Sequence, residues 1–134
     1  MTEVLSKESL ALIERPIIAH LATIDSKGRP QITALWIDHD GNDILVNTAE
    51  GRAKANNMRR DPEVGISLVD PQNPYAVVSL RGKVTDITTD GADAHIDSLA
   101  KKYMGVDRYP NRTDDEVRIK VRISPEHIFR QPAE

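Results

Sequence analysis

The chain has 134 residues, which suits one domain built around a single core. Charged residues make up 29% of it, and no apolar run approaches the ~20 residues that span a bilayer, so a membrane-spanning protein is excluded. The chain has no cysteine and four scattered histidines, which excludes disulfides, Cys nucleophiles and thiolate metal sites. We therefore expect no bound metal.

The net charge is −3, which is not the positive field of a nucleic-acid-binding protein. The N-terminus, MTEVLSKESLALIE, lacks the basic and apolar regions of a signal peptide. We therefore expect a cytoplasmic protein that binds neither nucleic acid nor membrane.

The first half of the chain predicts a short helix followed by three strands. Ser6 is a suitable N-cap for a helix over residues 6–14, which Pro16 ends. Runs rich in apolar and β-branched residues predict strands at 17–24, 31–38 and 43–49. The segments between them, DSKGRP and HDGND, contain glycine and are typical of turns. The three strands are expected to form a meander.

The second half predicts two further helices and three more strands. A short helix is expected between Gly51 and Asp61, followed by strands at 64–70 and 75–88, where Gly82 marks a bulge or a barrel corner. Apolar residues at helical spacing predict a helix over 90–103, and alternation predicts a last strand at 117–123. Six strands without regular βα alternation favour a mainly β protein, an antiparallel barrel with peripheral helices, as one domain over residues 1–134.

The segment from Gly51 to Arg60 is the main candidate for a binding site. Residues 52–60 read RAKANNMRR, with four cations and no acid. A helix that begins after Gly51 presents free backbone N–H groups, and Arg52 and Lys54 add full positive charges suited to a phosphate. From composition alone, an ordinary solvated helix face explains the same pattern.

Several motifs in this order resemble those of a known family. They are the hairpin IIAHLATIDSKGRPQITALWID at 17–38, the run GRAKANNMRRDP at 51–62, Tyr75 and Gly82 in the fifth strand, and AKKYMG at 100–105. Together they resemble the pyridoxamine 5′-phosphate oxidase-like, FMN-binding split-barrel family. More narrowly, they are similar to its actinobacterial branch that uses the deazaflavin coenzyme F-420.

The resemblance implies a six-stranded antiparallel split β-barrel that forms a homodimer, with two cofactor sites at the subunit interface. It also implies the residues that bind the cofactor. Those matching the phosphate and tail contacts are Arg52, Lys54, Asn57 and Arg60. Those matching the stretch along the ring system are Gln31, Ile32, Thr33 and Ala34, and those under the ribityl chain are Asn47, Thr48 and Ala49. We nominate no catalytic side chain, because such chemistry belongs to the cofactor.

The implied function is that of an F-420-dependent oxidoreductase, a reductase that transfers a hydride from the reduced 8-hydroxy-5-deazaflavin coenzyme to a conjugated small-molecule acceptor. The short chain lacks the additional basic and aromatic residues for a vitamin-B6 phosphate substrate. Three alternatives remain open. The first is an FMN-binding oxidoreductase or pyridoxamine-phosphate-oxidase-like flavoprotein, the second a non-catalytic cofactor carrier, and the third a β-barrel module that contacts nucleic acid.

A few conspicuous residues have a structural as well as a functional interpretation. Trp36 suits a core or a dimer interface better than a place beside the cofactor ring. Tyr75 is the tyrosine that we expect nearest a ligand, because it opens a strand beside a loop. The basic residues of RIKVR at 118–122 are interpreted as cations that guard an exposed strand edge, rather than as an extension of the anion site.

Overall fold

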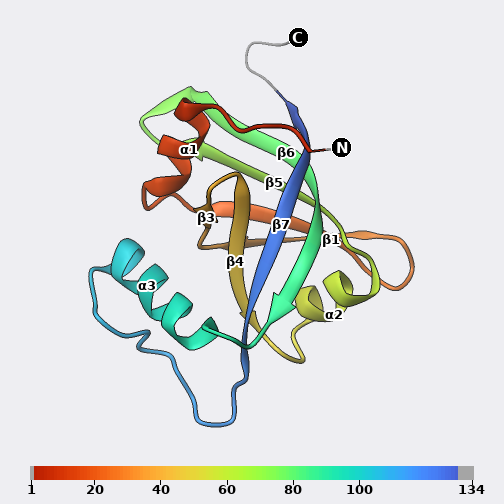
Figure 1. The fold of residues 1–134 in the computed structure, drawn as a ribbon, viewed down its shortest axis with the longest axis vertical. Coiled ribbons are helices and arrows are strands. Elements are labelled where there is room, and N and C mark those ends of the chain that lie inside the picture. The colour runs from red at the N-terminus through yellow and green to blue at the C-terminus, as the bar shows by residue number, and fades with distance from the viewer. Residues whose placement is uncertain (1, 130–134) are drawn as a thin grey trace.

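The computed structural model describes residues 2–129, which form three helices and seven strands (Figure 1). The helices are α1 (Lys7–Glu14), α2 (Ala53–Arg60) and α3 (Ala92–Met104). The strands are β1 (Ala19–Ile24), β2 (Pro30–Leu35), β3 (Asp38–Asp40), β4 (Asp43–Ala49), β5 (Glu63–Asp70), β6 (Asn73–Thr88) and β7 (Arg118–Phe129). None of the helices in the described part of the chain is long and apolar enough to cross a membrane.

All seven strands belong to one antiparallel sheet in the order β2-β1-β5-β6-β7-β4-β3. The sheet curls around a core (Figure 1) that includes Leu21, Val46, Ile66 and Leu80, all nearly inaccessible to solvent. The outermost strands, β2 and β3, do not pair with each other, but the chain passes directly from one to the other through residues 36–37. The barrel is therefore split at this seam, and the predicted mainly β, antiparallel fold class is confirmed.

The number of strands differs from the six that the sequence predicts. The strand expected at 31–38 ends at Leu35, and a separate strand β3 begins at Asp38 and pairs with β4. Residues 39–40 belong to β3 rather than to the turn that the sequence predicts at 39–43. The turn that remains between β3 and β4 is tight and contains Gly41 at φ +59°. The last strand also continues to Phe129, because it pairs with β6 as far as Ser79.

Helix α3 supplies hydrogen bonds to the backbone at the seam. The Tyr103 hydroxyl accepts a bond from the Ile37 N–H (3.1 Å) and donates one to the Ile17 carbonyl (2.6 Å). The Lys102 ammonium donates to the carbonyls of Ile13 (2.6 Å) and Ile37 (2.7 Å). Burial lowers the pKa of Lys102, which the charges of Asp38 and Glu14 partly oppose. These side chains satisfy both backbone groups of Ile37 at the seam and tie them to the chain around α1.

Gly82 lies at a bulge between β6 and β7, as its position in the sequence indicates. The register of the two strands shifts between Arg81 and Gly82. A Cβ atom at this position would come within 2.7 Å of the Ser124 carbonyl oxygen and 2.9 Å of a methyl carbon of Ile123. Only glycine lets the two backbones approach so closely, and the bulge lets the long strand β6 bend around the barrel.

Candidate functional site

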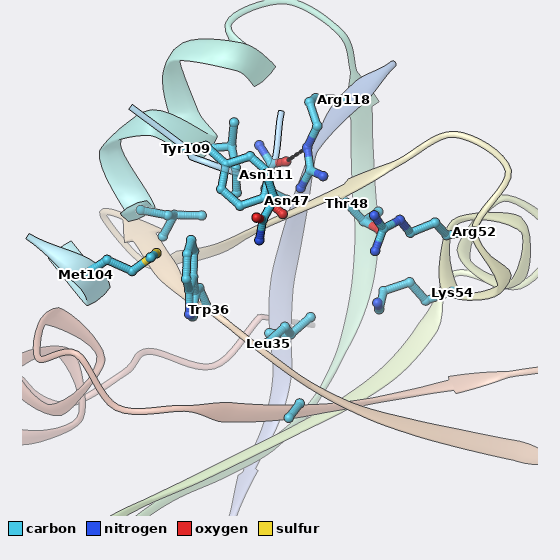
Figure 2. A pocket seen from close by; sticks show the side chains of 13 residues that line it. Leu35, Trp36, Asn47, Thr48, Arg52, Lys54, Met104, Tyr109, Asn111 and Arg118 are labelled. Carbon is cyan, nitrogen blue, oxygen red and sulfur yellow. Dashed lines mark hydrogen bonds between the residues drawn. The ribbon is translucent and has the colours of Figure 1, made fainter. Parts of the chain in front are cut away.

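A pocket of about 250 Å³ opens at one end of the barrel, where β4 leads into α2 (Figure 2). One side is formed by the end of β4, the first turn of α2 and the start of β7. The other side is formed by residues 34–36 at the end of β2, by α3 and by the loop that follows α3. The two sides differ in chemistry, one being cationic and the other apolar and aromatic.

The cationic side carries Arg52, Lys54 and Arg118 (Figure 2). A single carboxylate, that of Glu116, accepts from both Arg52 (2.9 Å) and Arg118 (3.0 Å). Burial lowers the pKa of Lys54, and the charges of Arg52 and Arg118 lower it further. Within the described residues Lys54 makes no ion pair, so the four groups together carry an excess of positive charge.

Two neutral features of the same wall also suit an anion or a polar ligand. Helix α2 has Arg52 as its N-cap, without a side-chain bond to the helix, and no acid in its first turn. The first N–H groups of the helix are therefore left to a ligand or to water. The buried hydroxyl of Thr48, which lines the pocket, has no hydrogen-bond partner among residues 2–129. A buried hydroxyl without a partner is costly, and a ligand in the pocket would relieve that cost.

The other wall is built around Trp36. Its ring stacks on Tyr103, with centroids 5.3 Å apart, and meets Tyr109 edge to face at 6.0 Å. Met104, Ile96 and Leu99 of α3 extend this wall. A flat aromatic and aliphatic surface opposite a cationic one suits a ligand that has a planar ring at one end and an anionic group at the other.

The loop after α3 brings Tyr109 and Asn111 to the pocket and is held by Asp97. The Asp97 carboxylate accepts from the Tyr109 N–H (2.8 Å) and from the Arg112 guanidinium (2.6 Å). The bond from Tyr109 is the largest cause and lowers the pKa of Asp97; burial opposes it, and Arg112 lowers the pKa further. Asp97 therefore remains charged well into the acid range.

The structure brings five of the eleven residues predicted to bind a cofactor to this pocket. They are Ala34, Asn47, Thr48, Arg52 and Lys54. Ala49 is buried beside them but does not line the pocket, and it pairs with Arg118 across β4 and β7.

The other predicted residues lie elsewhere. Asn57 is buried and donates to Thr23 (3.0 Å) and Gln31 (2.8 Å), while Arg60 donates to Asn57 (2.8 Å) and to the Ile24 carbonyl (3.1 Å). These bonds tie α2 to the β1–β2 hairpin outside the pocket. On β2, Ile32 is 65% exposed, whereas the hydroxyl of Thr33 is buried and has no partner among the described residues. Their contacts with a cofactor stay predictions.

Other pocket residues were missed or interpreted differently from the sequence. Trp36 lines the pocket and is not part of the core, while its place at a dimer interface stays a prediction; Tyr75 is 83% exposed and lies outside the pocket. The edge-strand interpretation of residues 118–122 is wrong, because β7 pairs with β6 on one side and β4 on the other. Arg118 is buried at the pocket. Its signal in the sequence was a cation at the start of a strand, next to the acid Glu116.

The fold and the pocket together define a split-barrel protein with a pocket that is cationic on one side. Residues 5–131 match the pyridoxamine 5′-phosphate oxidase family, and the chain belongs to this family. One similar solved structure is an F-420 reductase, with 31% identity, a TM-score of 0.85, and coverage of 95% of this chain and 100% of that chain.

Two further structures extend the comparison. A conserved hypothetical protein, Rv2991 from Mycobacterium tuberculosis, has 26% identity and a TM-score of 0.70, with 93% of this chain and 83% of that chain covered. HutZ, a heme storage protein from Vibrio cholerae, shares the fold at 15% identity and a TM-score of 0.65, with 95% and 94% covered. The family and the F-420 reductase together support an oxidoreductase-type protein with a flavin or deazaflavin cofactor.

Proposed function

We propose that this protein is an F-420-dependent oxidoreductase that transfers a hydride from the reduced deazaflavin to a conjugated small-molecule acceptor. The main support is the cationic wall of the pocket, where Arg52 and Arg118 share one carboxylate and Lys54 has no ion pair among the described residues. Such a wall suits the phosphate of the coenzyme. The similar F-420 reductase favours the deazaflavin among the cofactors that this chemistry admits.

The residues of the pocket fit such a cofactor. Arg52 and Lys54 would hold the phosphate, with Arg118 behind them, and the partnerless hydroxyl of Thr48 would bond to the polyol chain. The ring would lie along β2 toward the wall formed by Trp36 and Tyr109. When bound, the deazaflavin supplies the hydride.

The protein itself contributes binding, orientation and the exclusion of water. The apolar wall keeps water from the ring face, and the cationic wall fixes the phosphate end, so that the acceptor meets the ring in one orientation. The pocket residues supply no group to which we assign a proton transfer. Acceptor specificity would then depend on the loop held by Asp97, which brings Tyr109 and Asn111 to the pocket.

The active form in this proposal is a cytoplasmic homodimer. At about 250 Å³, the pocket of one chain is smaller than the roughly 300–1,000 Å³ of most small-molecule sites. The edge strand β2 beside it exposes Ile32 at 65%, and Ile18 just before β1 is 45% exposed. A second copy packed on this face would cover the apolar side chains and complete the cofactor site.

An FMN-dependent oxidoreductase is the second candidate, because the family match is to pyridoxamine 5′-phosphate oxidase and FMN also carries a phosphate on its ribityl chain. Fluorescence titration with F-420 and, separately, with FMN discriminates the two. We expect the tighter binding for F-420, and exclusive binding of FMN would refute the first proposal. Reduced F-420 should then be oxidised by at least one enone or quinone acceptor. Tight binding without turnover of any acceptor would indicate a cofactor carrier.

A further inference from the structure

Four polar side chains form a continuous chain of contacts that runs from the pocket to the partly exposed Asp38 at the start of β3. Arg118 donates from Nε to the Asn47 Oδ1 atom (2.8 Å), the bond drawn in Figure 2. The Asn47 amide nitrogen donates to the Ala92 carbonyl (2.9 Å) and to Nδ1 of His95 (3.1 Å). Nε2 of His95 lies 3.4 Å from an Asp38 carboxylate oxygen. Arg118, Asn47 and His95 are all buried.

The donors and acceptors of this chain fit together in only one way. A guanidinium only donates, so the oxygen of Asn47 must face Arg118 and its amide nitrogen must face Ala92 and His95. Nδ1 of His95 must then accept, which places the proton of the neutral ring on Nε2, toward Asp38.

Asp38 is ionised at neutral pH, which favours this arrangement. Burial raises the pKa of Asp38, but the nearby His95 ring, the bond from the His39 N–H and the charge of Lys102 outweigh it, so the pKa lies below its ordinary value. A carboxylate beside Nε2 stabilises the tautomer that carries its proton there. The charge of Asp38 therefore influences the orientation of Arg118 through the two side chains between them.

We propose that His95 is a positioning residue that, together with Asp38, fixes the Asn47 amide and through it the guanidinium of Arg118. The other contacts of that guanidinium are the bond from Nη1 to Glu116 (3.0 Å) and the ring of Tyr109, 5.3 Å from its central carbon. The bond from Nε to Asn47 adds a contact on another side of the guanidinium and so fixes its plane. Arg118 then faces the pocket beside Lys54 in one conformation, ready for an anion.

The part of this inference that concerns the cofactor phosphate rests on the proposed function. The part that concerns the position of Arg118 does not depend on it. The test therefore needs one measurement on the protein without cofactor and one with it. Two variants of His95 separate the hydrogen bond from the volume of the ring. His95→Leu removes the acceptor, whereas His95→Asn offers an oxygen close to the position of Nδ1.

The first measurement is the NMR signal of the Arg118 Nε–H in the protein without cofactor, assigned by its disappearance in Arg118→Lys. We expect this proton to exchange slowly with water in the wild type and in His95→Asn, and rapidly in His95→Leu. Nitrogen shifts of the His95 ring should also show the proton on Nε2. Slow exchange retained in His95→Leu, or a proton on Nδ1 of the neutral ring, would overturn the proposal.

The second measurement is the affinity for F-420 by fluorescence titration. The affinity of His95→Leu should be about tenfold lower than that of the wild type, which is the effect of one hydrogen bond that orients a charged group. The affinity of His95→Asn should be close to that of the wild type. Val78→Ala is the matched control, since it destabilises the core away from the pocket. An equal loss of affinity in Val78→Ala would reduce His95 to a purely structural role. If the wild type binds neither F-420 nor FMN, the proposed function fails, and the exchange measurement alone decides the role of His95.

Discussion

Lys54 lies near the guanidinium groups of Arg52 and Arg118, and burial together with their charges lowers its pKa. An anion in the pocket would remove this repulsion, so the side chain should contribute more to binding than to folding. We expect Lys54→Ala to weaken the binding of F-420 by about 1.5–3 kcal/mol, the range for a hydrogen bond to a charged group, with little change in the free energy of unfolding.

Fluorescence titration and urea denaturation measure the two effects of Lys54→Ala. Lys83→Ala is the matched control, because Lys83 lies on β6, is half exposed and pairs only loosely with Glu63 at 3.8 Å. Unchanged affinity in Lys54→Ala, or an equal loss in both variants, would remove Lys54 from the phosphate site.

Individual pocket residues could be predicted from the sequence where they lie close together along the chain. Arg52 and Lys54 follow a strand and a glycine, and this local pattern made them candidates that the family resemblance then favoured over a solvated helix face. Arg118, Trp36 and Tyr109 reach the pocket only through pairing and packing over long distances in sequence. The sequence did not indicate His95, because the helix over residues 90–103 was predicted from the spacing of its apolar residues alone.

Among the strands, β6 depends on a bulge at Gly82, and this gives a test with an internal control. Gly82→Ala places a Cβ within 2.7 Å of a backbone oxygen, where neither strand can yield easily. We expect it to reduce the free energy of unfolding by about 1–3 kcal/mol. In Gly65→Ala, on the adjacent strand β5, the nearest atom is the Ala22 Cβ at 3.6 Å, which is an ordinary contact.

Urea denaturation of both glycine variants gives the comparison. Gly65→Ala should change the free energy of unfolding by less than about 1 kcal/mol, since alanine suits a strand better than glycine does. Equal stability of the two variants would show that the bulge relaxes around a side chain.

The sequence predicted the helices and most of the strands to within a few residues, because their periodicity and turns are local. The break at residues 36–37 was not visible in QITALWID, where the apolar pattern continues without a glycine or proline. The break depends on the seam of the barrel, where Tyr103 and Lys102 of α3 bond to the backbone of Ile37. A contact between residues so far apart leaves no trace in the local pattern.

The attachment of the loop after α3 depends on the negative charge of the Asp97 carboxylate, which is lost when acid protonates it. Contacts with the Tyr109 N–H and Arg112 lower the pKa of Asp97 below its ordinary value of 3.8, so the folded state binds this proton less tightly than the unfolded chain. The stability that Asp97 contributes is therefore present above that value and is lost as the pH falls through the folded-state pKa. Asp97→Asn should be less stable than the wild type at neutral pH, with the difference vanishing in acid.

Urea denaturation of the wild type and Asp97→Asn at several pH values between about 7 and 2 measures this contribution. Asp93→Asn is the control on the same helix, since Asp93 is more exposed and lies 3.5 Å from Arg112 without holding the loop backbone. A stability difference for Asp97→Asn that persists unchanged in acid would show that its charge is not the cause.

For the molecule as a whole, the small pocket and the exposed edge strand β2 argue for a second copy. Stable interfaces bury roughly 800 Å² on each partner, and an uncovered apolar edge strand is a risk for aggregation. Ile32 is 65% exposed on this strand, and the resemblance places it beside the cofactor ring. Ile32→Lys should therefore convert the dimer to a monomer and also weaken the binding of F-420, because both depend on the same face.

Light scattering after size exclusion measures the mass, and fluorescence titration measures the affinity. Val4→Lys is the matched control, since Val4 is also apolar and 73% exposed but lies before α1, away from β2. A wild-type protein that is monomeric yet binds F-420 tightly would show that one chain holds the cofactor alone. A dimer that survives Ile32→Lys with full affinity would place the interface on another face. Loss of the dimer with full affinity would separate assembly from binding, and β2 would then not contribute to the cofactor site.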